Sequence, residues 1–257
     1  MQFPELRGKV AVVTGASRSI GIGAATCRAL AAQGCAIFFT SYSPYDALAF
    51  PGSATANDSQ SLAAELREMG VPAAFIEVDL GLPDSPKEIL DSAEQLLGLP
   101  TILVNNATYS QKDGFERLDA MGLDAHYAVN LRGTAMLSVE FARRCPPACG
   151  GRIINLTSGQ EREPMTGELA YAATKGAISA FTRSLAKEVA AKGINVNAVD
   201  PGPSDTGWMS DQLRTELMAS HANGRLGQPE DAARLIVFLA SEAARQLSGE
   251  TIHARGI

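Results

Sequence analysis

KVAVVTGASRSIGIG, residues 9–23, is the stretch that decides the fold class of this chain. Its first five residues, Lys9–Val13, are mostly apolar and predict a strand buried on both faces, and the pattern from Gly21 to Gln33 predicts a helix. Glycines between a strand and a helix allow a tight turn whose backbone N–H groups approach and attract a pyrophosphate. A glycine cluster elsewhere is often a bare turn, but this placement indicates that the turn binds a dinucleotide.

The same alternation of strand and helix continues along nearly the whole chain. Further buried strands are predicted at Cys35–Thr40, Ala73–Val78, Thr101–Val104, Arg152–Leu156, Ile194–Val199 and Glu250–His253. Helical patterns lie between them at Asp58–Met69, Pro86–Leu97, Leu123–Arg144 and Leu169–Ala191. Repeated strand–helix–strand units require a parallel sheet with right-handed crossovers. We therefore expect an α/β fold, a single doubly wound Rossmann-type domain over residues 1–257, with about seven strands and helices on both faces.

Residues Ser41–Asn57 are the one long stretch without a clear pattern. They are rich in Ser, Pro, Gly and Ala and directly follow the second predicted strand. No linker, composition break or internal repeat divides the chain here or elsewhere. We expect an enlarged, structureless loop and not a domain boundary.

The composition excludes several classes of protein. With 257 residues, of which 46% are hydrophobic, the chain can bury a core and does not resemble a disordered protein. Its net charge is −6 and its 22 Lys and Arg residues form no dense run, so neither nucleic acid nor a membrane surface is expected as a partner. No apolar run approaches the ~20 residues that cross a bilayer, and the N-terminus lacks a secretory signal pattern. These features predict a cytoplasmic protein.

Cysteine and histidine residues are few and scattered. The four cysteines, Cys27, Cys35, Cys145 and Cys149, are too few for a disulfide scaffold, and the Cys145–Cys149 spacing is not that of a CxxC redox pair. We therefore expect reduced thiols. The three histidines form no pair with metal-ligand spacing, so no metal site is expected.

Tyr171 and Lys175 are the strongest candidates for catalysis. At positions i and i+4 of a predicted helix, their side chains share one face. A nearby ammonium favours a phenolate, which would lower the pKa of Tyr171 from about 10 toward the working range of a general acid or base. Taken alone, the pair would be interpreted as an ordinary pair of residues on a helix surface.

Two further polar residues lie at informative positions. Ser158 follows the predicted strand Arg152–Leu156, and ligands bind at the carboxyl ends of strands in open parallel sheets. Its hydroxyl could donate to a substrate carbonyl oxygen, or it could simply be a turn residue. Asn130 falls inside a predicted helix although asparagine is a poor helix former. An inward amide that holds a water or a backbone kink is one interpretation, and an ordinary polar helix position is the other.

These residues occur together in a known arrangement. The glycine turn resembles the TGxxxGxG motif of the short-chain dehydrogenase/reductase family, with two extra residues, Ser19 and Ile20, between Gly15 and Gly21. The turn is still expected to cradle a dinucleotide. The resemblance covers nearly the whole chain and fits the compact, single-domain subgroup that includes the 3-oxoacyl carrier-protein reductases. Four residues match the family's catalytic tetrad: Asn130, Ser158, Tyr171 and Lys175.

The resemblance includes the segments that bind the cofactor in the family. Asp79 is similar to the aspartate that contacts adenine, residues 105–108 match the NNAG motif with Thr108 in place of its glycine, and residues 201–206 resemble the PGxxxT segment beside the nicotinamide. The implied cofactor-binding residues are Gly15, Ser17, Arg18, Gly21, Ile22, Gly23, Ser41, Asp79, Leu80, Asn106, Ala107, Tyr171, Lys175, Pro201, Gly202 and Thr206. The ending, Thr251–Ile257, departs from the family pattern.

The resemblance implies reversible hydride transfer between nicotinamide C4 and the carbon of a small-molecule ketone or secondary alcohol. Ser158 and Tyr171 would bond the carbonyl oxygen, and Tyr171 would give it a proton. Lys175 would stabilise the tyrosinate and hold the nicotinamide ribose, and Asn130 would position a water. A catalytically silent dinucleotide-binding sensor is the alternative, because fold does not fix function.

The substrate itself is not identified by the sequence. Residues 204–224 hold several apolar side chains, which predict either an adaptable lid over the site or simple packing on the core: Trp208, Met209, Leu213, Leu217 and Met218. The family includes reductases of acyl carrier-protein substrates, sugars, steroids and small ketones.

The second predicted strand determines the expected cofactor. NAD-specific sites place an acidic side chain at the end of this strand, where it binds the ribose 2′-OH. Ser41 stands there, 18 residues after Gly23, and Arg18 in the glycine turn could pair with a 2′-phosphate. We therefore expect NADP(H) to be preferred. NAD(H) remains possible, because the long loop could fold Asp46 back toward the ribose and the expanded turn could swing Arg18 away.

The two longest predicted helices, Leu123–Arg144 and Leu169–Ala191, carry several apolar positions. The family commonly pairs the equivalent helices across a two-fold axis, so we expect a homo-oligomer, most simply a homotetramer. The alternative is that these faces all pack on the chain's own sheet.

Overall fold

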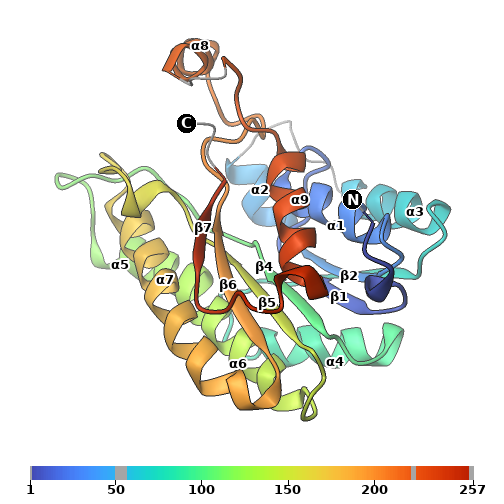
Figure 1. The fold of residues 1–257 in the computed structure, drawn as a ribbon. Coiled ribbons are helices and arrows are strands. Elements are labelled where there is room, and N and C mark those ends of the chain that lie inside the picture. Colours follow the sequence, from blue (N-terminus) through green and yellow to red (C-terminus); the bar gives the residue numbers. More distant parts are fainter. Residues whose placement is uncertain (1, 50–56, 221–223, 255–257) are drawn as a thin grey trace.

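A computed structural model describes residues 2–49, 57–220 and 224–254 of the chain. Seven strands join one parallel sheet in the order β3-β2-β1-β4-β5-β6-β7 (Figure 1). Their bounds are β1 Val10–Val13, β2 Ala36–Ser41, β3 Ala73–Glu77, β4 Ile102–Asn105, β5 Arg152–Leu156, β6 Asn195–Asp200 and β7 Thr251–His253. The predicted doubly wound α/β fold is confirmed.

Helices cover both faces of the sheet (Figure 1). One apolar core lies between the sheet and α1 (Ile22–Ala31), α3 (Asp58–Glu68) and α9 (Pro229–Ala240). The other lies between the sheet and α4 (Ser85–Leu97), α6 (Thr134–Arg144) and α7 (Leu169–Val189). Strands β1, β2, β4 and β5 are buried along their full length, which explains why they lack polar alternation. Short 3₁₀ helices lie at Pro4–Leu6, Gly159–Glu161, Ala190–Lys192 and Glu242–Ala244.

The strand order reverses between β1 and β4. Open α/β sheets bind ligands in the crevice outside the carboxyl ends of the strands at such a reversal. The helix α8 (Asp211–Ser220) stands away from the layers at this edge (Figure 1). In the described part of the chain, no helix is both long and apolar enough to cross a bilayer.

The predicted helix Leu123–Arg144 is present but not uniform. It consists of α5 (Ala120–His126), a π-helical segment η2 (Tyr127–Gly133) and α6 in direct succession. π-Helical turns are frequent at functional sites, because the extra residue per turn redirects nearby side chains. Asn130 lies in the middle of η2, so the interpretation of this residue as marking a backbone irregularity agrees with the structure.

The predicted structureless loop Ser41–Asn57 contains a helix, which corrects the prediction. The helix α2 spans Ser43–Ala49, and residues 50–56 lie outside the described residues. Ser43-Pro44 begins α2 as Ser85-Pro86 begins α4. The sequence therefore contained a signal for the start of a helix, but the Ser, Pro and Gly content of the whole stretch favoured the prediction of a loop.

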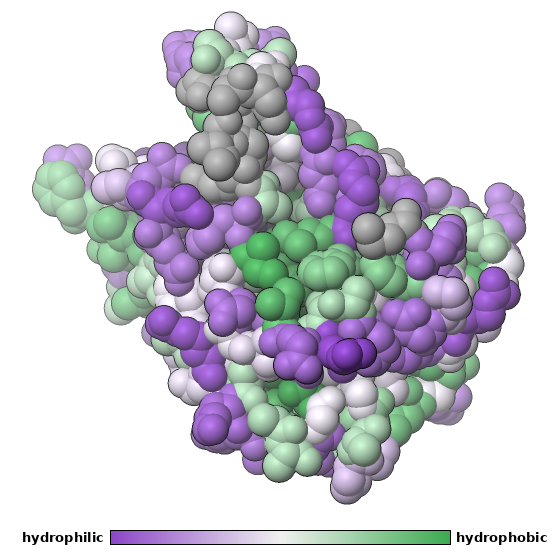
Figure 2. All heavy atoms as spheres, viewed as in Figure 1, coloured by the Kyte–Doolittle hydropathy of each residue, from purple (hydrophilic) through white to green (hydrophobic). Residues whose placement is uncertain are grey.

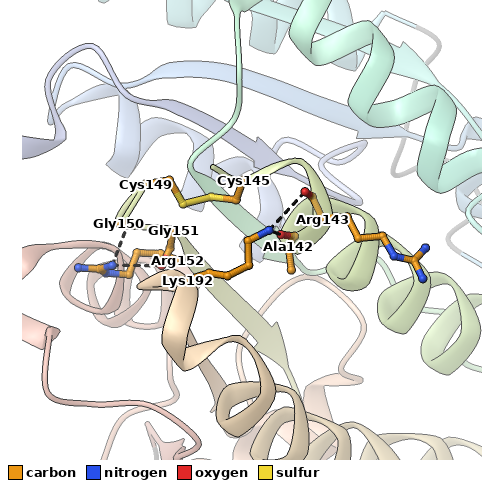
Figure 3. Close-up of a disulfide and its surroundings, with 8 residues drawn as sticks. All are labelled: Ala142, Arg143, Cys145, Cys149, Gly150, Gly151, Arg152 and Lys192. Carbon is orange, nitrogen blue, oxygen red and sulfur yellow. Dashed lines mark hydrogen bonds between the residues drawn. A yellow bond between two sulfur atoms is a disulfide. The ribbon is translucent and has the colours of Figure 1, made fainter. Parts of the chain in front are cut away.

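The expectation of reduced thiols is wrong for two of the four cysteines. Cys145 and Cys149 form a disulfide across a Cα–Cα distance of 6.0 Å (Figure 3). After α6 ends, the chain turns back on itself through Ala148, whose φ is +60°, and spacing alone could not predict that turn. Lys192 fastens the preceding helix end by donating from Nζ to the carbonyl oxygens of Ala142 and Arg143 (Figure 3). Cys27 and Cys35 are free and buried.

Candidate active site

A cavity of about 1250 Å³ runs along the carboxyl ends of the strands. Most of the predicted site residues line it: Gly15, Ser17, Arg18, Gly21, Ile22, Gly23, Ser41, Asp79, Leu80, Asn106, Ala107, Ser158, Tyr171, Pro201, Gly202 and Thr206. Asn130 and Lys175 are buried behind this lining. The face of the molecule below α8 is largely polar around a central group of apolar side chains (Figure 2).

The glycine turn is locked against the end of β4. Gly15 has a φ of +70°, and a Cβ on it would lie 2.6 Å from the Ala107 Cα. A Cβ on Gly23 would lie 2.5 Å from the Gly15 carbonyl oxygen. Asn106 Nδ2 donates to the carbonyl oxygens of Thr14 and Gly15 at 2.8 and 2.9 Å. The turn therefore tolerates no side chain at these two glycines, as a backbone cradle for a pyrophosphate requires.

Tyr171 and Ser158 meet at the cavity wall. Tyr171 lies in the first turn of α7, and its hydroxyl hydrogen-bonds the side chains of Ser158 and Thr108. Lys175 Nζ lies 5.5 Å from the centroid of the Tyr171 ring and donates to the Leu156 carbonyl oxygen at 2.8 Å. The predicted shared helix face is therefore present, and the strand end of β5 brings Ser158 to it.

The predicted direction of the Tyr171 pKa shift is wrong. Burial raises the pKa of Tyr171 to about 12, although the hydrogen bonds with Ser158 and Thr108 act to lower it. Burial also lowers the pKa of Lys175 to about 8, and only 3% of this residue is exposed. Enclosure penalises both charged forms, and this outweighs the help that an ammonium gives a phenolate.

Asn130 uses its whole hydrogen-bonding capacity on protein groups. Its Oδ1 accepts from Tyr109 N at 2.7 Å and from Thr108 Oγ1 at 3.1 Å. Its Nδ2 donates to the Tyr109 carbonyl oxygen at 2.9 Å and to Thr174 Oγ1 at 3.1 Å. A primary amide offers two donors and two acceptor sites, so this side chain holds the loop after β4 and has no group left for the water that was predicted.

The cavity wall contains both charged groups on which the cofactor prediction depends, Arg18 and Asp46. β2 ends at Ser41, as the count from Gly23 predicted; this residue is buried, and its Oγ has no partner among the described residues. Arg18 stays in the cavity wall, where Nη1 donates to the Thr206 carbonyl oxygen at 2.9 Å. Asp46 on α2 lies 3.9 Å from Arg18 Nε.

Asp46 is itself buried, with 7% of the residue exposed. Burial raises the pKa of its carboxyl, although a hydrogen bond with Ser17 and the charge of Arg18 act in the opposite direction. The loop thus folds Asp46 back into the cavity wall, where it lies beside Arg18. Both residues line the same cavity.

Asp113 is a structural contributor that the sequence did not reveal. This residue lies in the loop before α5, and its Oδ1 and Oδ2 accept from the backbone N–H groups of Leu169 and Ala170 at 2.7 and 2.9 Å. These are the first two residues of α7, so Asp113 caps the helix that carries Tyr171. Capping by a residue 56 positions away leaves no local sequence signal.

The predicted lid residues divide between the two interpretations. Trp208, Leu213 and Leu217 line the cavity, and Trp208 Nε1 donates to the Ser204 carbonyl oxygen at 3.0 Å. Met209 is buried and Met218 is exposed. Three of the five apolar residues of this segment therefore form an apolar wall of the site, and the two methionines do not line it.

The divergent C-terminal segment supports the loop that follows β6. His253 Nδ1 lies 2.9 Å from Asp200 Oδ2, and Asp200 Oδ1 accepts from the Gly202 N–H at 2.9 Å. The departure from the family ending thus supplies a partner for the carboxylate that holds the Pro201-Gly202 loop. Residues 255–257 of that ending lie outside the described residues.

Three features together define a dinucleotide-dependent oxidoreductase. They are a doubly wound sheet, a glycine turn without room for side chains, and a Ser–Tyr–Lys group at the carboxyl edge of the sheet. Comparison with known proteins agrees: a family model described as enoyl-(acyl carrier protein) reductase matches residues 15–256. The chain belongs to the short-chain dehydrogenase/reductase family.

Individual relatives match over almost their whole length. The chain is 48% identical over 250 residues to YjdA, an uncharacterized oxidoreductase of Bacillus subtilis, with 96% of each chain covered. It is 35% identical to a 3-oxoacyl-(acyl-carrier-protein) reductase of Pseudomonas aeruginosa, covering 98% of this chain and 97% of the relative. A short-chain dehydrogenase from Burkholderia cenocepacia, solved in complex with NADP, is 31% identical with a TM-score of 0.87 and covers 98% of both chains.

Proposed function

We propose that this chain reduces a small-molecule ketone or oxo group, or oxidises the corresponding secondary alcohol, by hydride transfer with NADP(H). The observation that carries the proposal is the hydrogen bond between Tyr171 and Ser158 on the wall of a cavity that reaches the glycine turn. A bound nicotinamide cofactor would supply the hydride. Residues 1–257 would act as one dinucleotide-binding domain, since all seven strands belong to one sheet.

Each member of the tetrad has a role that its position supports. The Ser158 and Tyr171 hydroxyls would bond the carbonyl oxygen, and Tyr171 would pass it a proton as general acid. Two donors aimed at the developing alkoxide would stabilise the transition state. Lys175, held by the Leu156 carbonyl oxygen, would stabilise the tyrosinate and bind the nicotinamide ribose. Asn130 would act through the loop it holds, residues 108–109.

The residues present fit a dinucleotide along the cavity. Gly15 and Gly23 leave the backbone open to a pyrophosphate, and Asp79 and Leu80 line the cavity where an adenine would bind. Arg18 and Ser41 favour a 2′-phosphate, and the Burkholderia relative was solved with NADP. Asp46 opposes a 2′-phosphate, so NAD(H) is the alternative cofactor.

The test of this proposal is NADPH consumption with a panel of ketones and 3-oxoacyl thioesters, with direct measurement of NADPH binding. Oxidation of NADPH in proportion to alcohol formed would support the proposal. NADPH binding without turnover on any carbonyl would favour the sensor alternative.

A cytoplasmic location is part of the proposal, because the reaction draws on a pool of reduced nicotinamide cofactor.

We also propose a homo-oligomer, most simply a homotetramer. Apolar side chains are exposed along α5, η2, α6 and the start of α7, the helices that carry the catalytic face: Met121, Leu123, Tyr127, Met136 and Leu169. A second copy would cover them in a closed, symmetric assembly.

A further inference from the structure

Thr108 stands where the family motif has glycine, and its side chain enters the candidate site. It follows β4, lines the cavity and lies between two tetrad members on different elements. Its Oγ1 donates to Asn130 Oδ1 at 3.1 Å, and the same side chain hydrogen-bonds the Tyr171 hydroxyl. A glycine here could make neither contact.

The hydrogen-bond capacities determine the direction of each bond. A threonine hydroxyl has one donor and two acceptor sites. Because the Thr108 proton points to Asn130, the hydroxyl of Tyr171 donates to a lone pair of Thr108. Threonine is β-branched and stiff at χ1, so the position of its oxygen is set by the backbone after β4. The proton of Tyr171 is thereby given a defined direction before a substrate binds.

The same hydroxyl can serve Tyr171 after proton transfer. When Tyr171 gives its proton to the substrate oxygen, its O–H bond breaks, a substrate O–H bond forms and a phenolate remains. Rotation of the Thr108 hydroxyl would turn its proton from Asn130 to the phenolate, with no proton lost or gained by Thr108. Asn130 Oδ1 would still accept from the Tyr109 N–H, so no buried acceptor is orphaned.

We propose that Thr108 is a positioning residue for Tyr171: it orients the tyrosine hydroxyl in the resting site and donates to the phenolate once the proton has left. The inference rests on the proposed function, in which Tyr171 is the general acid and base. A donor to the phenolate stabilises the charged form, so removing it should raise the apparent pKa of Tyr171 in catalysis.

The test compares Thr108→Val, which keeps the shape and removes the hydroxyl, with Thr108→Ser, which keeps the hydroxyl. In the oxidation direction the phenolate is the active form, so kcat rises with pH. We expect Thr108→Val to move this limb up by about half to one pH unit, the size of one net hydrogen bond. At neutral pH its kcat should fall about three- to tenfold, while its Kd for NADPH stays within about twofold. Thr108→Ser should restore the wild-type profile.

Thr26→Val is the matched control, because Thr26 is a buried threonine of α1 that does not line the cavity and whose Oγ1 has no partner among the described residues. Its pH profile should match that of the wild type. An unmoved profile in both Thr108→Val and Thr108→Ala, or no rescue by Thr108→Ser, would overturn the inference. The ultraviolet absorbance of the phenolate with NADP⁺ bound, corrected with Tyr171→Phe, supplies a readout without turnover. The variant could shift the pH at which this phenolate absorbance appears although the protein turns over no carbonyl. That result would contradict the proposed function and support the positioning role.

Discussion

At the scale of single residues, we propose that Arg18 and Ser41 decide the choice of cofactor. The Arg18 guanidinium lies in the cavity wall, and Ser41 ends β2 without a carboxylate. We predict that wild type has a higher kcat/KM with NADPH than with NADH. Arg18→Ala and Ser41→Asp should each shift this preference toward NADH, by roughly 1.5–3 kcal/mol for a lost charge-assisted contact.

The measurement is kcat/KM for both cofactors in all three proteins. A wild type that prefers NADH, or an Arg18→Ala variant with unchanged preference, would show that the 2′-phosphate assignment is wrong.

Asp46 should act in the opposite direction. Its carboxylate lies 3.9 Å from Arg18 Nε and would lie close to a phosphate bound there. Removing its charge with Asp46→Asn should strengthen NADPH binding about tenfold or more while NADH binding changes little. Glu77→Gln is the control, because Glu77 accepts from Ser43 at the start of α2 and forms no ion pair with Arg18 within the described residues. Calorimetric titration with each cofactor gives the ratio; equal ratios in Asp46→Asn and wild type would contradict the prediction.

For Tyr171 and Lys175, the sequence predicted the geometry of the pair but not the direction of the tyrosine pKa. Their spacing of four predicted a common helix face, and the structure has it. The direction of the Tyr171 pKa could not be read from spacing, because burial of the hydroxyl depends on segments far along the chain. The positions of Thr108, Asp46 and Asp113 at the site also depend on segments that are far apart in the sequence. For this reason the sequence identified Thr108 only as a departure from the family motif.

At the scale of elements, α7 depends on a cap supplied from another loop. Asp113 accepts from the first two N–H groups of α7, whose own N-cap residue, Glu168, makes no side-chain cap. We predict that Asp113→Ala costs about 0.5–2 kcal/mol of stability, or a few degrees in Tm. It should also lower kcat more than NADPH affinity, since Tyr171 lies in the turn that loses its cap.

The stability effect has a pH dependence of known sign. Burial acts to raise the pKa of Asp113, but the backbone N–H groups of Ala170, Leu169 and Gly114 together hold the pKa below its ordinary value. A carboxyl with a depressed pKa stabilises the fold above its unfolded pKa of about 3.9 and loses that contribution as the pH falls through the folded pKa. The Tm difference between wild type and Asp113→Ala should therefore be steady near neutral pH and narrow below about pH 4.

Asp124→Ala is the control, an exposed aspartate on the neighbouring α5. It should leave Tm nearly unchanged at every pH. A Tm difference for Asp113→Ala that persists undiminished in acid would rule out the charged cap.

Elements were predicted well where local patterns decide them. The seven strand predictions agree with the observed strands to within one residue at each end. The signal is clearest for the strands that are buried along their full length, because such strands lack polar alternation. The π-helical geometry of η2 was not predicted; Asn130 in its middle hydrogen-bonds residues 108 and 109, which are more than 20 positions away in the sequence. The Cys145–Cys149 disulfide was missed because it needs a left-handed turn at Ala148.

At the scale of the whole molecule, the alternation of strands and helices predicts a parallel sheet but not its order. The order β3-β2-β1-β4-β5-β6-β7 was not predicted and is seen only in the structure. That order places the carboxyl ends of β1 and β4 at the reversal, and so brings the glycine turn and the Tyr171 face to one cavity.

Assembly belongs to this scale as well. The exposed apolar residues on α5, η2, α6 and α7 predict a homo-oligomer, so light scattering should give a multiple of 27.0 kDa, most simply four copies. Met136→Glu, at an exposed position of α6, should weaken the assembly. A concentration-independent mass near 27.0 kDa for the wild type would contradict the prediction.

The most direct test of the central claim is the single-turnover rate of NADPH oxidation by wild type and Tyr171→Phe with a ketone that the wild type reduces. General acid–base catalysis contributes about 10²- to 10⁴-fold, so Tyr171→Phe should lose turnover by that factor. NADPH affinity should be nearly unchanged, because the variant keeps Lys175 and the glycine turn. Retention of more than about a tenth of the wild-type rate would contradict the assignment of Tyr171 as the general acid.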